Sequence, residues 1–287
     1  MSRNDNRSGA QPSPDPTAAL EAAEPTDHKR SPLEFVTPTD YVELPSKGKG
    51  YPPDHPLCNK ETVEIKYMTA KEEDILTSRT LVKKGLALEK FLESIILDKT
   101  IKTSSLLTGD RNAIIIAARM SGFGEIYETL ATCPSCGEKS QQNFDLKSPK
   151  VWHGKIPDIG DVQATEKGTY LVTVPVSKFR VELRLMTGQN EANVMKATTD
   201  AKKRGFAEVN MTEQYKQMIA SVEGHSERRV INHFIANAPA RDTRFLKTIY
   251  MSINPDVKIV KDFVCPHCNH EQELEVSFGT DFFWPDR

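Results

Sequence analysis

The sequence predicts an α+β protein with a helical N-terminal region, a β module built from two distant segments, and an inserted region of strands followed by helices. Residues 179–185 alternate polar and apolar side chains, as a half-buried strand does. Apolar residues recur at helical spacing over 86–97, and helical patterns fill most of 191–253. Two similar hairpin patterns, 126–146 and 257–278, each carry a Cys-x-x-Cys pair at the turn. Together these patterns indicate the α+β class.

Composition and charge exclude several classes of protein. The 287 residues, 38% apolar and 27% charged, allow one sizeable core or two modest ones. No stretch approaches the roughly 20 apolar residues that span a bilayer, and the first 30 residues do not form a secretory signal. We therefore expect a cytosolic origin without a membrane partner. The formal charge of -2 offers nothing to recruit a polyanion, which disfavours nucleic acid as a partner.

The N-terminus divides into an arm and a core. Residues 1–33 are polar and Pro-rich with almost no large apolar side chains, so we predict a disordered arm that docks on a partner if it orders at all. Residues 34–124 are predicted to form a β lead-in and a helical core. The alternation of Val63, Ile65 and Tyr67 indicates a strand within this region.

Capping patterns mark the helices of this core. Thr69 resembles an N-cap, and Glu72 three positions later can close a capping box on a short acidic helix. Thr108 or Asp110 is expected to cap a later helix that runs toward Gly122. Asp110 and Arg111 are interpreted as a cap and a structural ion pair rather than as active-site residues.

The second half of the chain predicts an insertion between two halves of a β module. Residues 125–147 plus 257–287 form the module, and residues 148–256 form the inserted strand-then-helix domain. The insertion should contain two strands and four helices, with Asp242 as a cap for the last helix. The strands are expected at 170–176 and 179–185, and the helices at 191–203, 212–222, 226–237 and 240–253.

Four of the five cysteines form two similar turns. Cys133-Pro134-Ser135-Cys136 is followed by Gly137, and Cys265-Pro266-His267-Cys268 is followed by Asn269. Gly and Asn readily adopt the left-handed conformation that a zinc knuckle needs, and each such turn supplies one edge of a thiolate tetrahedron. We therefore predict one structural zinc per chain with these metal ligands: Cys133, Cys136, Cys265 and Cys268. The module would then be a split zinc-ribbon-like unit.

The spacing of the two cysteine pairs implies that the predicted site joins two distant parts of the chain. The 128 residues between Cys136 and Cys265 far exceed the spacing of a simple ribbon, which requires an inserted domain. Three alternatives remain open: a thioredoxin-like redox pair, disulfides, and two separate or shared metal sites with His267 and His270 as ligands. Four thiolates would leave no open position for a catalytic water.

Other features have structural interpretations. The glycine-rich segment 46–50 lacks the order of a phosphate-binding loop and is expected to be a surface loop. The basic clusters 202–204 and 228–229 are expected to be solvated helix faces, with contact to a polyanion as the alternative. The aromatic residues of 278–285 should either fold back on the module or anchor in another subunit.

Four segments together resemble a known family. In order along the chain they are Leu44-Pro45-Ser46-Lys47-Gly48, Val63–Glu73, Leu106-Leu107-Thr108-Gly109-Asp110-Arg111 and Cys133-Pro134-Ser135-Cys136-Gly137. The order and content are similar to the T-even-type contractile-tail phage baseplate protein family, which comprises hub and hub-assembly components. The resemblance is best over residues 34–146 and looser beyond, and the polar arm is longer than the family pattern.

The resemblance implies a structural or assembly component of a phage baseplate hub, without enzymatic activity. It also implies a virion location after assembly in the host cytoplasm, with other baseplate or tail proteins as partners and self-association as a further possibility. The alternative from the residues alone is a nucleic-acid-binding zinc-ribbon protein, but Glu138, Glu271, Glu273 and Glu275 make the predicted hairpins acidic. A hydrolase would need a clustered acid, base and nucleophile that the sequence does not present.

Overall fold

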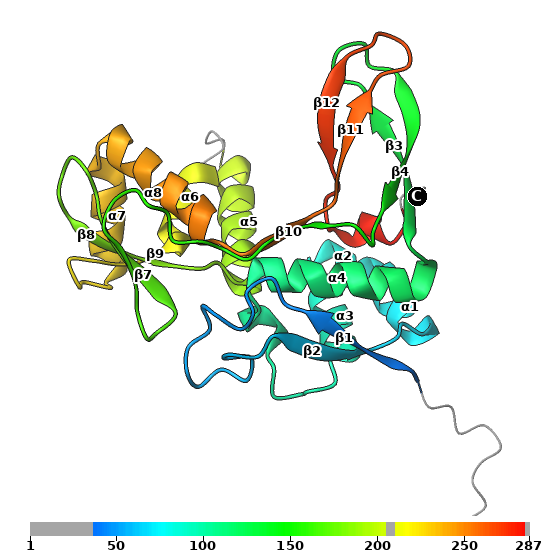
Figure 1. Cartoon of the computed structure of the whole chain (residues 1–287), viewed down its shortest axis with the longest axis horizontal. Helices are drawn as coiled ribbons and strands as arrows, with labels where there is room; N and C mark the ends of the chain where they lie inside the picture. Colours follow the sequence, from blue (N-terminus) through cyan, green and yellow to red (C-terminus); the bar gives the residue numbers. More distant parts are fainter. Residues whose placement is uncertain (1–36, 205–209, 285–287) are drawn as a thin grey trace, which may run out of the picture. The chain divides into compact units, whose positions relative to one another are not determined.

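The computed structural model describes residues 37–204 and 210–284, and in these ranges helices combine with antiparallel sheets, as the predicted α+β class requires (Figure 1). The predicted arm, residues 1–33, lies outside the described residues. Within the described ranges no helix has both the length and the apolar character needed to cross a membrane.

The N-terminal region contains one hairpin-like sheet and a helical core. Strands β1 and β2 pair antiparallel, with Val42 opposite Val63, and both side chains are buried. The predicted strand and helices are confirmed, although the first helical stretch divides at Ser78. The elements are β1 (Thr39–Glu43), β2 (Thr62–Lys66), α1 (Ala70–Thr77), α2 (Arg79–Lys83), α3 (Ala87–Ile95), the 3-10 turn η1 (Thr103–Ser105) and α4 (Thr108–Phe123).

Helix α4 is the centre of this core. Its consecutive residues Ile114, Ile115 and Ile116 are all buried, so several faces of the helix meet other elements. The N-cap is Leu107, without a side-chain cap, so the prediction that Thr108 or Asp110 caps the helix is wrong. Asp110 instead lies in the first turn, where its carboxylate binds another segment of the chain.

The capping box predicted at the start of α1 is confirmed, and Glu72 does more than cap. Its side chain is fully buried and accepts hydrogen bonds from the Thr69 N–H (3.0 Å), Lys66 Nζ (2.7 Å) and Ser94 Oγ (2.5 Å). Burial raises the pKa of this carboxyl, but the hydrogen bonds from Lys66, Ser94 and Thr69 outweigh burial and lower it to about 2.

Glu72 should therefore stabilise the fold in a pH-dependent way. Because its pKa is lower in the folded chain than in the unfolded chain, the stabilisation is present above the ordinary pKa and is lost as the pH falls toward 2. We expect Glu72→Gln to lower the free energy of unfolding by roughly 3 kcal/mol at pH 7. The difference from wild type should shrink steadily between pH 4.5 and pH 2.5 in urea titrations. A difference that does not change over this range would contradict the assignment.

The described residues in the middle of the chain form a four-stranded sheet, in the order β6-β7-β8-β9, and four helices. Both predicted strands are confirmed as β7 and β8. The bounds are β5 (Lys150–Trp152), β6 (Val162–Ala164), β7 (Thr169–Thr173), β8 (Arg180–Arg184), α5 (Gly188–Lys203), α6 (Asn210–Met218), β9 (Ile219–Val222), α7 (Arg228–Asn237) and α8 (Ala240–Ile253).

Two expectations in this region are wrong. The helix predicted over 212–222 ends at Met218, because Ile219–Val222 pairs with β8 as an edge strand and buries most of its side chains there. Asp242 is not the cap of α8, whose N-cap is Pro239. Its buried carboxylate accepts hydrogen bonds from the Val176 and Ser177 N–H groups at 2.7 and 2.9 Å, so it fixes the turn after β7 to the helix.

The C-terminal segment returns to the N-terminal region. Its elements are β10 (Asp256–Lys258), β11 (Val260–Val264), β12 (Glu271–Glu275) and the 3-10 turn η2 (Thr280–Phe282). The strand predicted over 257–264 is two strands, because β10 pairs with β5 while only β11 pairs with β12. The β5–β10 pairing holds the two ends of the 148–256 segment side by side.

The aromatic C-terminus folds back on the chain's own core. Phe282 and Phe283 are each 1% exposed, and Phe283 contacts Phe91 of α3 at a ring distance of 5.1 Å. Phe282 lies 4.9 Å from Tyr127, at the base of a hairpin described below. Of the two alternatives for residues 278–284, folding back is therefore the one observed. We call residues 278–284 the clamp, because they pack on both the helical core and the base of that hairpin.

Candidate metal centre

Two hairpins present the four cysteines of the two Cys-x-x-Cys pairs at their turns. The first joins β3 (Ile126–Thr132) to β4 (Lys139–Asp145), and the second joins β11 to β12. The two turns have the same pair of backbone hydrogen bonds, all 2.9 Å long. In the first turn, Cys133 N–H donates to Glu138 O and Gly137 N–H donates to Cys133 O. In the second, Cys265 N–H donates to His270 O and Asn269 N–H donates to Cys265 O. The hairpins lie side by side in Figure 1.

The residue after each second cysteine has the conformation expected of a knuckle. Gly137 has φ of 76° and Asn269 has φ of 56°, both in the left-handed region. This geometry turns backbone N–H groups toward sulfur. The N–H of Cys136 donates to the Cys133 sulfur and lowers the pKa of that thiol to about 6, with a further contribution from the Ser135 N–H. The Glu138 N–H lowers the pKa of the Cys136 thiol, but burial and the neighbouring sulfurs of Cys268, Cys265 and Cys133 outweigh it and raise that pKa. The cluster therefore cannot carry all of its negative charge unless a cation binds.

The sulfur atoms of Cys133, Cys136, Cys265 and Cys268 lie within 4.8 Å of one another. The Cys133–Cys268 and Cys136–Cys265 separations are both 3.7 Å. A tetrahedron with metal–sulfur bonds of about 2.3 Å has edges of about 3.8 Å, whereas a disulfide would place two sulfurs about 2.0 Å apart. The four thiols are free in the structure, and their spacing fits a single tetrahedral ion.

The surroundings of the cluster close it on one side. Cys133 and Cys265 are each 1% exposed and pack against Phe263 in a small apolar cluster, with Leu274 at its edge. Cys136 and Cys268 face solvent. Neither His267 nor His270 belongs to the group of described side chains that could hold an ion. The arrangement therefore favours one closed site over two sites that use histidine.

Phe263 and Leu274 were not identified from the sequence as part of this site. The signal that could have identified them is the strand alternation, which places Phe263 on the face of β11 opposite the exposed Asp262 and Val264.

The glycine-rich segment 46–50 is held to helix α4 by hydrogen bonds to Asp110. The buried Asp110 carboxylate accepts hydrogen bonds from Ser46 N–H (2.9 Å), Ser46 Oγ (2.6 Å) and Tyr51 Oη (2.8 Å). Gly48 has φ of 71°, and an added Cβ would lie 2.3 Å from the Lys60 backbone nitrogen. Gly48 thus packs closely against the backbone of Leu57 and Lys60.

The residues around Asp110 tie α4 to other segments. Gly109 allows close approach to Pro255, since a Cβ there would lie 2.3 Å from the Pro255 carbonyl oxygen. Arg111 forms an ion pair with Glu191 of α5 at 2.7 Å, so it has a structural role as predicted, but its partner is a distant residue that the sequence did not indicate. These contacts explain why polar residues occur together at the start of a buried helix.

Removing the Asp110 carboxylate should be costly. Asp110→Ala leaves the donors of Ser46 and Tyr51 buried without an acceptor, and each such donor costs about 1–3 kcal/mol. We expect a loss of roughly 4 kcal/mol in chemical unfolding. Asp98→Ala is a matched control, because Asp98 accepts two hydrogen bonds from Thr100 at the surface and should cost less than about 1 kcal/mol. Equal losses of stability in the two variants would contradict a stabilising role for the Asp110 hydrogen bonds.

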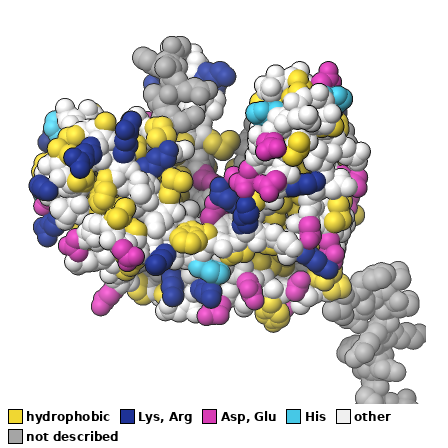
Figure 2. All heavy atoms as spheres, turned by 45° about the horizontal axis from the view of Figure 1, so that its top comes forward, with side chains coloured by type: hydrophobic (Ala, Val, Ile, Leu, Met, Phe, Trp, Pro, Cys, Tyr) yellow, Lys and Arg dark blue, Asp and Glu magenta, His cyan; other side chains and the backbone are white. Residues whose placement is uncertain are grey.

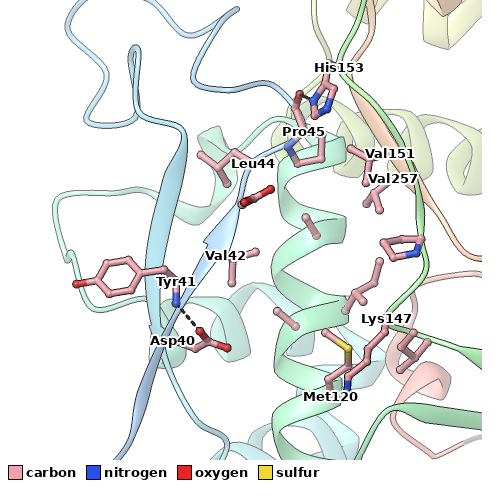
Figure 3. Close-up of a pocket in the computed structure, with 16 residues that line it drawn as sticks. Asp40, Tyr41, Val42, Leu44, Pro45, Met120, Lys147, Val151, His153 and Val257 are labelled. Atoms are coloured by element: carbon pink, nitrogen blue, oxygen red, sulfur yellow. Dashed lines mark hydrogen bonds between the residues drawn. The ribbon is translucent and has the colours of Figure 1, made fainter.

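A groove of about 320 Å³ lies beside α4 (Figure 3). One wall is β1 and the segment to Pro45, and the other runs from Leu146 to His153. Two of its polar side chains form hydrogen bonds with other residues that line the groove. His153 Nδ1 lies 2.9 Å from the Pro45 carbonyl oxygen, and the Asp40 carboxylate accepts from the Tyr41 N–H at 2.8 Å. The groove does not place an acid, a base and a nucleophile together.

Comparison with known protein families gives a match over most of the chain. The model of a family described as T4 bacteriophage base plate protein matches residues 37–284, which is most of the chain. No curated protein and no solved structure matches this chain.

Proposed function

The chain belongs to the T4 bacteriophage base plate protein family, and on this basis we propose that it is a non-enzymatic component or assembly factor of the hub region of a contractile-tail baseplate. It would act through contacts with other baseplate or tail proteins. The observation that carries the proposal is the length of the family match, which spans the N-terminal region, the insertion and both hairpins. A virion tail location follows from the same family.

We further propose that Cys133, Cys136, Cys265 and Cys268 hold one structural zinc per chain. The 3.7 Å sulfur separations and the all-thiolate donor set support zinc, which prefers tetrahedral sulfur ligands. With four protein ligands the ion would have no open position for a substrate. Its role would be to join residues 125–147 to 257–287 as one zinc-ribbon-like module.

In this architecture, residues 148–256 form an inserted domain. The β5–β10 pairing supports this division, because it brings the start and the end of the segment together next to the module. The insertion is still tied to residues 34–124 through Arg111–Glu191 and the Thr108 N–H, which donates to Met186 O at 3.1 Å. We propose that these contacts present the insertion as a rigid surface for partners.

The charge on the second hairpin argues against the nucleic-acid alternative. The side chains on the outer face of β11 and β12 include Asp262, Glu271, Glu273 and Glu275, all exposed. Such a face repels phosphate.

The test uses a phage that carries an early stop codon in this gene. The wild-type chain is then supplied in trans. Without the protein we expect tails that lack complete baseplates in electron micrographs, and restored baseplates when the wild-type chain is supplied. Quantitative mass spectrometry of purified particles then separates a virion component, present at fixed ratio, from an assembly factor that is left behind. Infectious particles with normal baseplates in the absence of the chain would overturn the proposal.

A further inference from the structure

Helix α8 carries an exposed basic face. Arg241, Arg244 and Lys247 follow one another at three-residue spacing, and Met251, one turn further, is 67% exposed. At 100° per residue these four side chains share one side of the helix, while Leu246, Ile249 and Ile253 on the other side are buried. The basic part of the face is about 9 Å long, and Met251 extends it to about 15 Å.

This basic face does not serve the stability of the chain. Among the described residues, none forms an ion pair with Arg241, Arg244 or Lys247. Arg241 and Arg244 also lie near the N-terminus of α8, where a positive charge opposes the helix dipole. Asp242, the only acid of the helix, is buried and accepts hydrogen bonds from Ser177 and Val176. An anionic group on another molecule would neutralise the positive charge of Arg241, Arg244 and Lys247.

The outer face of the β11–β12 hairpin has the opposite charge. Residues 260–275 contain one lysine and four acids, while residues 228–253 contain five Lys or Arg and one acid. Glu271, Glu273 and Glu275 form a column about 13 Å long, with Asp262 opposite Glu273 and Val264 opposite Glu271. Val264, at the end of this face, is 56% exposed.

Two of these carboxylates already have lysine partners, but only at the surface. Lys150 contacts Glu273 at 2.8 Å and Lys258 contacts Glu275 at 3.0 Å, with all four side chains about half exposed or more. Exposed pairs of this kind contribute little free energy, and each carboxylate keeps lone pairs for a second cation. Asp262 and Glu271 have no ion pair with a described residue, so the face remains net negative.

The two faces match in length and in the order of their groups. Each is a row of three charges within about 9–13 Å that ends in an exposed apolar side chain, Met251 on α8 and Val264 on β11. They cannot satisfy each other within one chain, because α8 and the hairpin lie in separate lobes (Figure 1). Figure 2 shows Lys and Arg side chains on the lobe of α8 and acidic side chains on the lobe of the hairpin.

We propose that the basic face of α8 docks on the acidic face of the β11–β12 hairpin of a second copy of this chain. The contact is head-to-tail, so a pair of copies keeps one free acidic face and one free basic face, and the association can continue into a ring or a row. Met251 would pack against Val264, and the three basic side chains would lie along the acidic column. The proposal does not depend on the location of the protein in a baseplate.

The test is sedimentation velocity of the full chain loaded with zinc. At 50 mM NaCl we expect wild type to associate as its concentration rises toward 100 μM, and at 500 mM NaCl to be monomeric, because exposed charges are screened by salt. Reversal of the basic face in Arg241→Glu/Arg244→Glu/Lys247→Glu, or of the acidic face in Asp262→Lys/Glu271→Lys/Glu273→Lys, should each weaken self-association at least tenfold.

Mixing the two reversed variants provides the specific result. One variant then has only acidic faces and the other only basic faces, so an equimolar mixture should associate although neither variant does alone. Arg79→Glu/Lys83→Glu/Lys84→Glu, at α2 and its C-cap, changes the total charge by the same amount as reversal of the basic face and should behave as wild type. Zinc content and thermal unfolding of each variant show that it is folded.

Three results would overturn the proposal. The first is a wild-type chain that stays monomeric at 100 μM and 50 mM NaCl. The second is folded reversed variants that associate as wild type does, or that fail to associate when mixed. The third is a basic face that binds duplex DNA under these conditions while self-association is unaffected by its reversal, which would make nucleic acid the occupant.

Discussion

Protein purified under reducing conditions without chelator is expected to contain about one zinc per chain, and Cys265→Ser is expected to lose it. The remaining three thiolates would be held close together without the charge that stabilises them, so the loss should destabilise the fold by on the order of 4 kcal/mol. For a chain of this size that corresponds to a drop of about 10 °C in melting temperature. Elemental analysis and calorimetry of the two proteins measure both effects.

The regions that lose amide protection in Cys265→Ser distinguish one site shared by both hairpins from two independent turns. Because Cys265 lies in one hairpin and Cys133 in the other, amide protection against hydrogen exchange should fall in β3–β4 as well as in β11–β12. Cys58→Ser is the control, since Cys58 lies outside the cluster and should keep the zinc. Near-zero zinc in the wild-type protein, or loss of protection in only one hairpin, would contradict a single four-cysteine site.

Removing the Phe283 ring is the second substitution expected to have a large effect. The side chain is 1% exposed and contacts the rings of Phe91, Phe123 and Phe282. Phe283→Ala leaves a cavity between α3 and the clamp, at a cost of about 3–5 kcal/mol. Chemical unfolding measures this directly. Limited proteolysis should also show earlier cleavage near residues 278–284, because the clamp would open locally before the rest of the chain unfolds.

Tyr41→Ala is the matched control for this substitution. Tyr41 is 65% exposed, so removal of its ring takes away surface rather than core and should cost less than about 1 kcal/mol. If Phe283→Ala costs no more than Tyr41→Ala, the C-terminal aromatic residues are not a clamp on their own chain and are available to a partner.

Arg119 lies beneath this clamp and has an uncommon environment. The residue is 6% exposed, and its guanidinium donates to the Phe282 carbonyl at 3.1 Å and lies 4.7 Å from the centre of the Phe123 ring. Burial lowers the pKa of this group, and the aromatic rings compensate part of the cost through cation–π contact. The side chain is a further link between α4 and the C-terminal segment.

Local sequence was enough for the features that depend on near neighbours. The capping box of Thr69 and Glu72, the helix at 240–253 and the paired knuckle turns all rest on contacts within a few residues, and each is observed. The similarity of the two turns also placed the four cysteines in one proposed site across a gap of 128 residues. Two half-sites with the same chemistry predict a partner for each other whatever lies between them.

The tertiary structure decided what depends on distant partners. Ile219–Val222 continues a helical pattern but forms strand β9, because pairing with β8 and burial there outweigh the local preference. Asp110 and Asp242 have the sequence of caps, yet each carboxylate binds backbone groups about 65 residues away. The sequence alone thus predicted most of the elements and the clustering of the four cysteines, since these follow from local geometry. Only the fold decided where the aromatic C-terminus packs and which charged faces remain unpaired, because both depend on which distant surfaces meet.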